Sequence, residues 1–230
     1  MSVQRETLLP VGAEVRVTAE SSRLALGVKR AVDFVLAVIG LLLLWPLLLV
    51  LAVLVRLDSP GPAIFRQRRL GRFGRPFDLY KLRTMVDGAE SLGAGLGIEN
   101  NDSRITPLGR WLRGTSLDEL PQLWNILRGD MSLVGPRPLF EVYLDRWDER
   151  QKKRLLLPQG LTGWAQSRGR NDVPWEDRLE MDVWYVEHWS LWLDVKIVLA
   201  TFWAVFTCRG VFAKDGQVAE FGNHVEEKNY

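Results

Sequence analysis

Two adjacent carboxylates, Asp118 and Glu119, are the residues of this chain best suited to chemistry on a phosphate. Carboxylate oxygens can hold a divalent metal, and one of them can act as a nucleophile. Pro121 is tolerated in a first helical turn, so we expect a helix that begins between Ser116 and Glu119 and runs to Arg128. Its free N–H groups and dipole would attract an anion. The same pattern also fits helix capping, either as a box of Ser116 with Glu119 or by Asp118 itself.

Basic residues that could bind phosphate groups follow and precede this dyad. Arg137 stands between two prolines, which gives a rigid mount for a bidentate contact, although an exposed turn would look the same. The segments 63–70 and 77–85 predict two strands of a hairpin joined by a Gly71–Gly74 turn. This hairpin is rich in cations, which favours either a phosphate site or a basic surface facing solvent or lipid; they are Arg66, Arg68, Arg69, Lys81 and Arg83.

A further acid, Asp182, falls on the apolar face of a helix that we expect Pro174 to open. An unpaired buried carboxylate is costly, so Asp182 should meet a cation or a metal. A structural ion pair explains it equally well. Just before this helix, a glycine-punctuated loop beginning at Gly160 carries two more arginines, Arg168 and Arg170.

These groups must be placed relative to an uncharged, strongly apolar run from Phe34 to Val55. At about 1.5 Å per residue this run is just long enough to cross a hydrocarbon core of about 30 Å. Pro46 near its middle removes a helical hydrogen bond and favours a bend. Lys29 and Arg30 before it and several arginines after it make both flanks basic, and positive residues stay in the cytoplasm. We therefore favour a re-entrant segment over a single span, although spans also tolerate proline.

The rest of the chain predicts mainly helices. A helix is expected over 139–157, with one apolar face that could pack on the core or lie on the membrane. In a second apolar segment over 191–208 the uncharged run 197–208 is too short to span, and the segment should lie in the interface plane or pack in the core. Four regions result: a mobile lead (1–27), a membrane anchor (28–57), a catalytic domain with interfacial helices (58–212) and a polar tail (213–230). The expected fold class is α+β, mainly helical, with a small β-hairpin.

Composition excludes several kinds of site. A single cysteine among 230 residues leaves no intramolecular disulfide and no multi-cysteine zinc site, and two histidines make a histidine relay improbable. Any chemistry must come from carboxylates, arginines and lysines. The net charge of +2 hides the crowding of basic residues beside the apolar run, which suits an anionic lipid surface. No nucleic-acid partner is expected.

The order of these motifs resembles the bacterial sugar transferases, the monotopic polyprenyl-phosphate phosphoglycosyl transferases. The likeness covers about 28–212 and rests on several segments in one order. They are Tyr80-Lys81-Leu82-Arg83-Thr84-Met85, Ser116-Leu117-Asp118-Glu119-Leu120-Pro121-Gln122-Leu123, Val134-Gly135-Pro136-Arg137-Pro138 and Gly160-Leu161-Thr162-Gly163-Trp164-Ala165-Gln166. Family members often carry serine immediately before the bending proline, where this chain has Trp45. It would be a short member of the family.

The resemblance implies transfer of a sugar 1-phosphate from a UDP-sugar to polyprenyl (undecaprenyl) phosphate with release of UMP, as the first membrane step of surface glycan synthesis. It implies Asp118 as nucleophile, Glu119 as a ligand of Mg²⁺ with it, and Asp182 nearby. The expected substrate contacts are Arg113, Arg137, Lys81, Arg83, Arg170 and Asp182. We expect a catalytic domain on the cytoplasmic face of the inner membrane. A single-span glycosyltransferase that releases UDP and a non-enzymatic scaffold are the alternatives. The sugar, the downstream glycan and a homodimer are left open.

Overall fold

The computed structural model describes residues 23–89, 98–99, 102–168, 174–206 and 217–218. It is mainly helical with small two-stranded sheets, as the sequence predicts. In chain order, the main elements are α1 (Arg23–Asp58), β1 (Ile64–Leu70), β2 (Pro76–Leu82), α2 (Pro107–Thr115), α3 (Gln122–Arg128), β4 (Ser132–Val134), α4 (Glu149–Lys152), β5 (Gly160–Thr162), α5 (Trp164–Arg168), α6 (Trp175–Glu187) and α7 (Leu191–Phe206). Two short strands, β3 (Ile98–Glu99) and β6 (Gln217–Val218), pair with each other.

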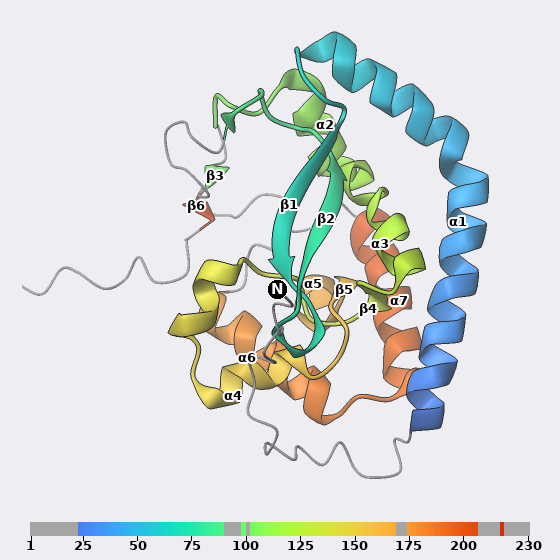
Figure 1. The fold of residues 1–230 in the computed structure, drawn as a ribbon, viewed down its shortest axis with the longest axis vertical. Helices are drawn as coiled ribbons and strands as arrows, with labels where there is room; N and C mark the ends of the chain where they lie inside the picture. The colour runs from blue at the N-terminus through green and yellow to red at the C-terminus, as the bar shows by residue number, and fades with distance from the viewer. Residues whose placement is uncertain (1–22, 90–97, 100–101, 169–173, 207–216, 219–230) are drawn as a thin grey trace, which may run out of the picture.

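The hairpin β1–β2 is confirmed and lies across the front of the domain (Figure 1). Its register pairs Phe65 with Lys81, Gln67 with Leu79 and Arg69 with Phe77. Directly opposed residues of an antiparallel pair share one face, so these six side chains lie on the same side of the hairpin. Phe77 and Leu79 on that side are buried in a core cluster with Ala37, Leu123, Ile126 and Met131. The hairpin is therefore seated on α1 and α3 by its β2 strand.

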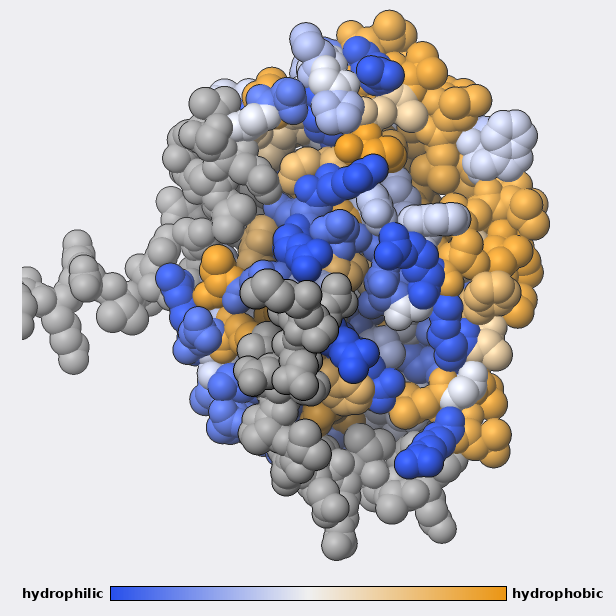
Figure 2. All heavy atoms as spheres, in the orientation of Figure 1, coloured by the Kyte–Doolittle hydropathy of each residue, from blue (hydrophilic) through white to orange (hydrophobic). Residues whose placement is uncertain are grey.

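Helix α1 is a single continuous helix with Pro46 inside it, and it curves along one side of the domain (Figure 1). The proline therefore does not end the helix. Most side chains along its middle are exposed and apolar, and Figure 2 shows them as one hydrophobic surface beside the hydrophilic hairpin face. By length and composition α1 could cross a membrane, and only 11% of its most apolar window is buried.

Both ends of α1 are attached to the domain. Near the first end, the Lys29 ammonium donates to Asp194 at 2.6 Å and to the Val134 carbonyl at 2.8 Å, and Asp33 accepts from the Leu133 N–H. Near the other end, Leu51 and Val55 are 2% exposed and pack against Leu82 and Leu112. The apolar run therefore begins and ends on the same domain.

The single helix predicted over 139–157 is wrong. A 3₁₀ helix (Glu141–Arg146), the short α4 and a second 3₁₀ helix (Lys153–Leu155) replace it. The break lies at Trp147 and Asp148, which are extended, and Asp148 starts α4 with a capping box that includes Gln151. The predicted apolar face is nevertheless buried, since Leu139, Tyr143 and Trp147 pack in one cluster. The pattern identified the apolar side but left open core or membrane contact, and its prediction of one continuous helix was wrong.

Helices α6 and α7 agree with the sequence prediction over the described residues. Pro174 precedes α6, and α7 begins at Leu191 and is described to Phe206. One side of α7 packs through Leu193 and Ile197 against the cluster that Ala25 and Leu26 of α1 also contact. Its other side exposes large apolar residues, namely Trp192, Val195, Leu199, Phe202 and Trp203. This second apolar surface adjoins the first residues of α1.

Candidate active site

The dyad lies on a 3₁₀ turn, Leu117–Glu119, between α2 and α3. Ser116 ends α2 in the left-handed region with φ 59°, and its N–H caps that helix instead of its side chain capping the next one. Helix α3 begins only at Gln122, and Pro121 precedes it. The capping interpretation of Ser116, Asp118 and Glu119 is therefore wrong, because no side-chain cap bond is formed at either helical segment. The predicted helix end at Arg128 is confirmed, with Gly129 at φ 88° after it.

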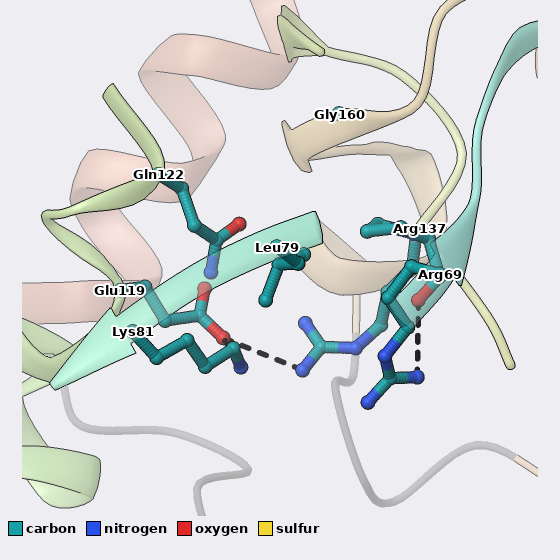
Figure 3. Close-up of a pocket in the computed structure, with 8 residues that line it drawn as sticks. Arg69, Leu79, Lys81, Glu119, Gln122, Arg137 and Gly160 are labelled. Atoms are coloured by element: carbon teal, nitrogen blue, oxygen red, sulfur yellow. Dashed lines mark hydrogen bonds and ion pairs between the residues drawn. The ribbon is translucent and has the colours of Figure 1, made fainter. Parts of the chain in front are cut away.

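Glu119 is held between two cations. Its Oε1 accepts from the Lys81 ammonium at 2.9 Å and from Arg137 Nη2 at 3.4 Å, as Figure 3 shows from the side of the pocket. Burial acts to raise the pKa of Glu119, but the charges and hydrogen bonds of Lys81 and Arg137 outweigh it and lower the pKa to about 2. Glu119 therefore stays ionised and joins the hairpin to the Arg137 segment.

Asp118 has the opposite electrostatics. It is 7% exposed, and burial together with the neighbouring Glu119 charge raises its pKa to about 6 against the lowering effects of Lys81 and Arg113. Within the described part of the chain, no hydrogen bond or ion pair to its carboxylate is found. A pKa one unit below neutrality leaves about nine in ten carboxylates ionised at pH 7. Asp118 is thus a poorly solvated anion, which suits a nucleophile better than a structural cap.

Arg113 comes from α2 and is placed beside this carboxylate by a hydrogen bond from its Nε to Thr84 Oγ1 at 2.7 Å. Burial lowers the pKa of its guanidinium, and the Asp118 charge opposes that effect. Thr84 follows β2, and its carbonyl accepts from the Thr106 N–H at the start of α2. Helix α2 is thereby fixed against the hairpin that carries Lys81.

A buried ion pair between Arg154 and Asp182 holds the backbone at Arg137 in place. Arg154 is fully buried, and its Nη2 donates both to Asp182 at 2.6 Å and to the Arg137 carbonyl at 2.6 Å. The structural ion pair weighed for Asp182 is therefore present, and Asp182 reaches the site through Arg154. Burial raises the pKa of Asp182, and Arg154 opposes that rise.

Glycines in two of the motifs are required by packing. A Cβ on Gly160 would lie 2.1 Å from the Gly135 nitrogen, and one on Gly163 would lie 2.2 Å from the Gly135 carbonyl oxygen. The strands β4 and β5 pair in parallel here, with Ser132 opposite Gly160. This close backbone contact sets the direction in which the chain reaches Arg137.

Two predicted substrate contacts have other outcomes. Arg83 is 5% exposed, and its guanidinium binds the carbonyls of Val55, Ser59 and Pro60, so it caps the end of α1. Arg170 lies outside the described residues. The structure brings together the dyad and three of the predicted cations, Lys81, Arg113 and Arg137. Asp182 is linked to this group only through Arg154.

Sequence reasoning missed Gln122 and Asn125, and it named Arg69 only as one of several hairpin cations that could form a phosphate site. Gln122 and Arg69 line the pocket, together with Leu79, Lys81, Glu119, Arg137, Pro138 and Gly160 (Figure 3). Asn125 is fully buried, and its amide accepts from the Tyr80 N–H and donates to the Asp78 carbonyl, which fixes β2 to α3. The strand alternation that puts Arg69 on the Lys81 face was available in the sequence. The role of Asn125 could not be predicted from the sequence, because it depends on the contact between α3 and β2.

The chemical capacity of the site follows from these charges. It holds two carboxylates among Lys81, Arg113 and Arg137, which is an arrangement for binding a multiply charged anion beside an acidic nucleophile. No group of three or more His, Cys, Asp or Glu is found among the residues that the structure describes. Mg²⁺ commonly takes only one or two carboxylates and completes its shell with substrate phosphates and water, so Asp118 and Glu119 suit it.

Taken together, a long exposed apolar helix and an acidic dyad beside a basic pocket are features expected of a membrane-associated enzyme that binds a phosphorylated ligand. Comparison with known proteins gives the family. Residues 24–208 match the family model described as bacterial sugar transferase, and the chain belongs to that family.

The named relatives are of the same kind. The chain is 43% identical over 192 residues to the uncharacterized sugar transferase EpsL of Bacillus subtilis, covering 84% of this chain and 94% of that protein. It is 44% identical over 211 residues to UDP-glucose:undecaprenyl-phosphate glucose-1-phosphate transferase of Caulobacter vibrioides, covering 87% and 75%. A relative of the same name from Escherichia coli is 42% identical over 192 residues, 80% of this chain but only 41% of that longer protein.

Proposed function

We propose that this protein transfers a sugar 1-phosphate from a UDP-sugar to polyprenyl phosphate, giving a polyprenyl-diphosphate sugar and UMP. The observation that carries the proposal is Asp118, a buried, largely ionised carboxylate that no helix cap explains, set among basic side chains. Relatives named as undecaprenyl-phosphate sugar-phosphate transferases support the substrate classes. Such a product would be the first membrane-bound intermediate of a surface glycan.

Two in-line displacements make up the proposed reaction. A carboxylate oxygen of Asp118 attacks the phosphorus next to the sugar, the bond from that phosphorus to the bridging oxygen breaks, and UMP departs with the electron pair. An oxygen of the lipid phosphate then attacks the same phosphorus and displaces Asp118. The covalent aspartyl intermediate divides a meeting of several anions into two steps.

The other groups bind and orient. Lys81 and Arg137, now paired with Glu119, would exchange that partner for phosphate oxygens, while Arg113 stays beside Asp118. Mg²⁺ held by Asp118 and Glu119 would neutralise diphosphate charge. The leaving UMP would thereby be stabilised without a histidine that protonates it.

We further propose that α1 enters the inner membrane from the cytoplasm and returns to the same face. The attachment of both its ends to one domain supports this reading, since Lys29 and Asp33 at one end and Leu51 and Val55 at the other contact that domain. A crossing would place the two ends of α1 on opposite sides of the bilayer, so either the Lys29 and Asp33 contacts or the Leu51 and Val55 contacts with the domain would be lost. The exposed apolar side of α7 would lie in the same interface.

Product analysis tests the reaction. The full-length protein in detergent or nanodiscs is incubated with Mg²⁺, a polyprenyl phosphate and a panel of UDP-sugars, and the nucleotide released is identified. UMP is expected from at least one donor, whereas UDP would show the alternative glycosyl transfer and no nucleotide would favour a scaffold. Asp118→Asn should abolish release and prevent trapping of a radiolabelled sugar phosphate on the protein. The exposed acid Asp145 gives a matched control, because Asp145→Asn should leave both unchanged.

Labelling tests the topology. In a Cys208→Ser background, Leu24→Cys and Leu57→Cys place thiols at the two ends of α1, where the native side chains are 76% and 78% exposed. Both should react with an impermeant reagent only after the inner membrane is opened. If Leu24→Cys is labelled in intact spheroplasts while Leu57→Cys is not, α1 crosses the bilayer and the re-entrant proposal is wrong.

A further inference from the structure

Arg69 differs from the other arginines of β1 in the side of the hairpin that it occupies. Residues two apart in a strand share a face, so Arg66 and Arg68 lie on one side and Arg69 on the other, with Gln67. The register places the Arg69 side over Leu79 and Lys81. Arg66 and Arg68 are exposed, and Arg68 meets Asp78 and Glu141 at the surface. Arg69 is half-buried and lines the pocket that contains Glu119.

The guanidinium of Arg69 is held in a fixed orientation. Its Nε and Nη2 both donate to the amide oxygen of Gln67, and its Nη1 donates to the Pro138 carbonyl at 3.3 Å. Its central carbon lies 3.5 Å from the centre of the Phe140 ring, so the planar group is stacked on that ring. Two neutral acceptors and an aromatic face thus orient this arginine before any ligand arrives, which lowers the entropy lost on binding.

The same contacts couple Arg69 to Arg137. Pro138 directly follows Arg137 in the chain, and Figure 3 shows both guanidinium groups on the side of the pocket opposite Glu119 and Lys81. Arg137 reaches across to Glu119, whereas Arg69 is tied to the Pro138 backbone. Two arginines that line the same side of one pocket can bind a single phosphate group through several charge-assisted hydrogen bonds.

We propose that Arg69 is a phosphate-binding residue of this site, acting with Arg137 on the side of the pocket opposite Glu119 and Lys81. The inference rests on the proposed function, because that reaction supplies two phosphate-bearing ligands, the donor diphosphate and the lipid phosphate. Both are phosphate esters and must approach the same Asp118, so the chemistry recognised is shared. The role assigned is binding, and Arg69 does not replace Asp118 or Glu119 in the chemical step.

Equilibrium binding tests this assignment without turnover. Full-length protein in nanodiscs is titrated with two probes, UDP in the presence of Mg²⁺ and geranyl phosphate as a short polyprenyl phosphate. The variant Arg69→Gln is compared with the wild type and with Arg68→Gln, the neighbouring arginine on the opposite face. A lost charged hydrogen bond to phosphate is expected to weaken binding roughly ten- to a hundredfold in Arg69→Gln. Arg68→Gln should bind both probes like the wild type.

The pattern of loss identifies the ligand. Weakening of UDP alone assigns Arg69 to the donor, weakening of geranyl phosphate alone assigns it to the acceptor, and weakening of both assigns it to a phosphate position that the two share. Binding of both probes within about twofold of the wild type would overturn the assignment. If the wild type itself binds neither probe, the proposed function fails and this inference fails with it.

A second variant covers the case in which Arg69→Gln does not fold. Arg69→Lys keeps the charge and the aliphatic stem but loses the planar fork that Gln67 and Phe140 orient. It should fold, as judged by an unchanged thermal midpoint. Its affinity for at least one probe should nevertheless be several-fold lower than that of the wild type. The assignment is overturned if a folded Arg69→Lys protein binds both probes as tightly as the wild type. Where Arg69→Gln also folds, it must show wild-type affinity too. The planar guanidinium of Arg69 would then make no contact with phosphate.

Discussion

The buried pair of Arg154 and Asp182 should respond unequally to the loss of either member. Arg154 is 0% exposed and Asp182 is 3% exposed, so removal of one partner leaves the other in the interior. Breaking such a pair typically costs about 3–5 kcal/mol of unfolding free energy. A guanidinium cannot give up its proton, whereas a carboxylate can take one and become neutral. We therefore expect Asp182→Ala to lie at the upper end of this range and Arg154→Met at or below its lower end.

The pH dependence of Arg154→Met follows from the same reasoning. Burial already raises the pKa of Asp182, and Arg154 opposes that rise, so its removal raises the pKa further. The native variant then holds a proton that the unfolded chain releases above its ordinary pKa of about 4. Stability conferred by this proton is present at low pH and is lost as pH rises toward the folded pKa. The slope approaches about 1.4 kcal/mol per pH unit for one proton.

Urea unfolding in detergent, followed by tryptophan fluorescence between about pH 5 and pH 8, measures both effects. The wild type sets the reference slope at each pH. Both variants should also lose transfer rate, because Arg154 holds the Arg137 carbonyl at 2.6 Å. Equal costs for Asp182→Ala and Arg154→Met, or a pH-independent difference between Arg154→Met and the wild type, would show that Asp182 does not take up a proton and would refute the argument.

Three further changes test the scaffold. Asn125→Ala leaves the Tyr80 N–H and the Asp78 carbonyl without this side chain, so unfolding free energy should fall by about 2–4 kcal/mol in the same urea titration. Gly160→Ala should yield no folded protein on size-exclusion chromatography, because the new Cβ would overlap backbone atoms that cannot move. Gly27→Ala is the control, since a Cβ there has nothing within 4 Å. It should fold normally, and its unfolding free energy should rise by up to about 1 kcal/mol. Pro46→Leu removes the proline from α1 and should increase periplasmic labelling of Leu24→Cys, and unchanged labelling would argue against a role of Pro46 in topology.

The sequence predicted those features that depend on local pattern. Alternation of residue types in 63–70 and 77–85 gave the hairpin, and Pro174 and Gly129 marked the start of α6 and the end of α3 correctly. The apolar periodicity placed Tyr143 and Trp147 on one side and left open whether that side meets the core or the membrane; in the structure it meets the core. What failed over 139–157 was helix continuity, because Asp148 caps a new helix there and its box with Gln151 competes with the periodic signal.

The dyad shows a different limit. Ser116 and Glu119 match a capping box in spacing, yet Ser116 adopts φ 59° and ends the preceding helix. A spacing rule counts residues and assumes that the chain runs straight into the next helix. Here a left-handed residue turns the chain first, so neither carboxylate caps a helix and Glu119 lines the pocket. This backbone conformation is rare outside glycine and is not signalled by residue type.

Positive charge gave the least reliable prediction, because arginine also binds backbone carbonyls, and residue type alone does not distinguish that role from phosphate binding. Arg83 binds three carbonyls at the end of α1, and Arg30 binds the carbonyls of Ile126 and Leu127 at the end of α3. Both helices lie at the apolar side of the domain, where a terminal carbonyl has little water to accept from. An arginine there donates hydrogen bonds to the last carbonyls of a helix, so it stabilises the helix end and does not bind phosphate. Those left for the pocket are the ones whose strand or turn faces Glu119, and Arg69 is distinguished from Arg68 by that criterion alone.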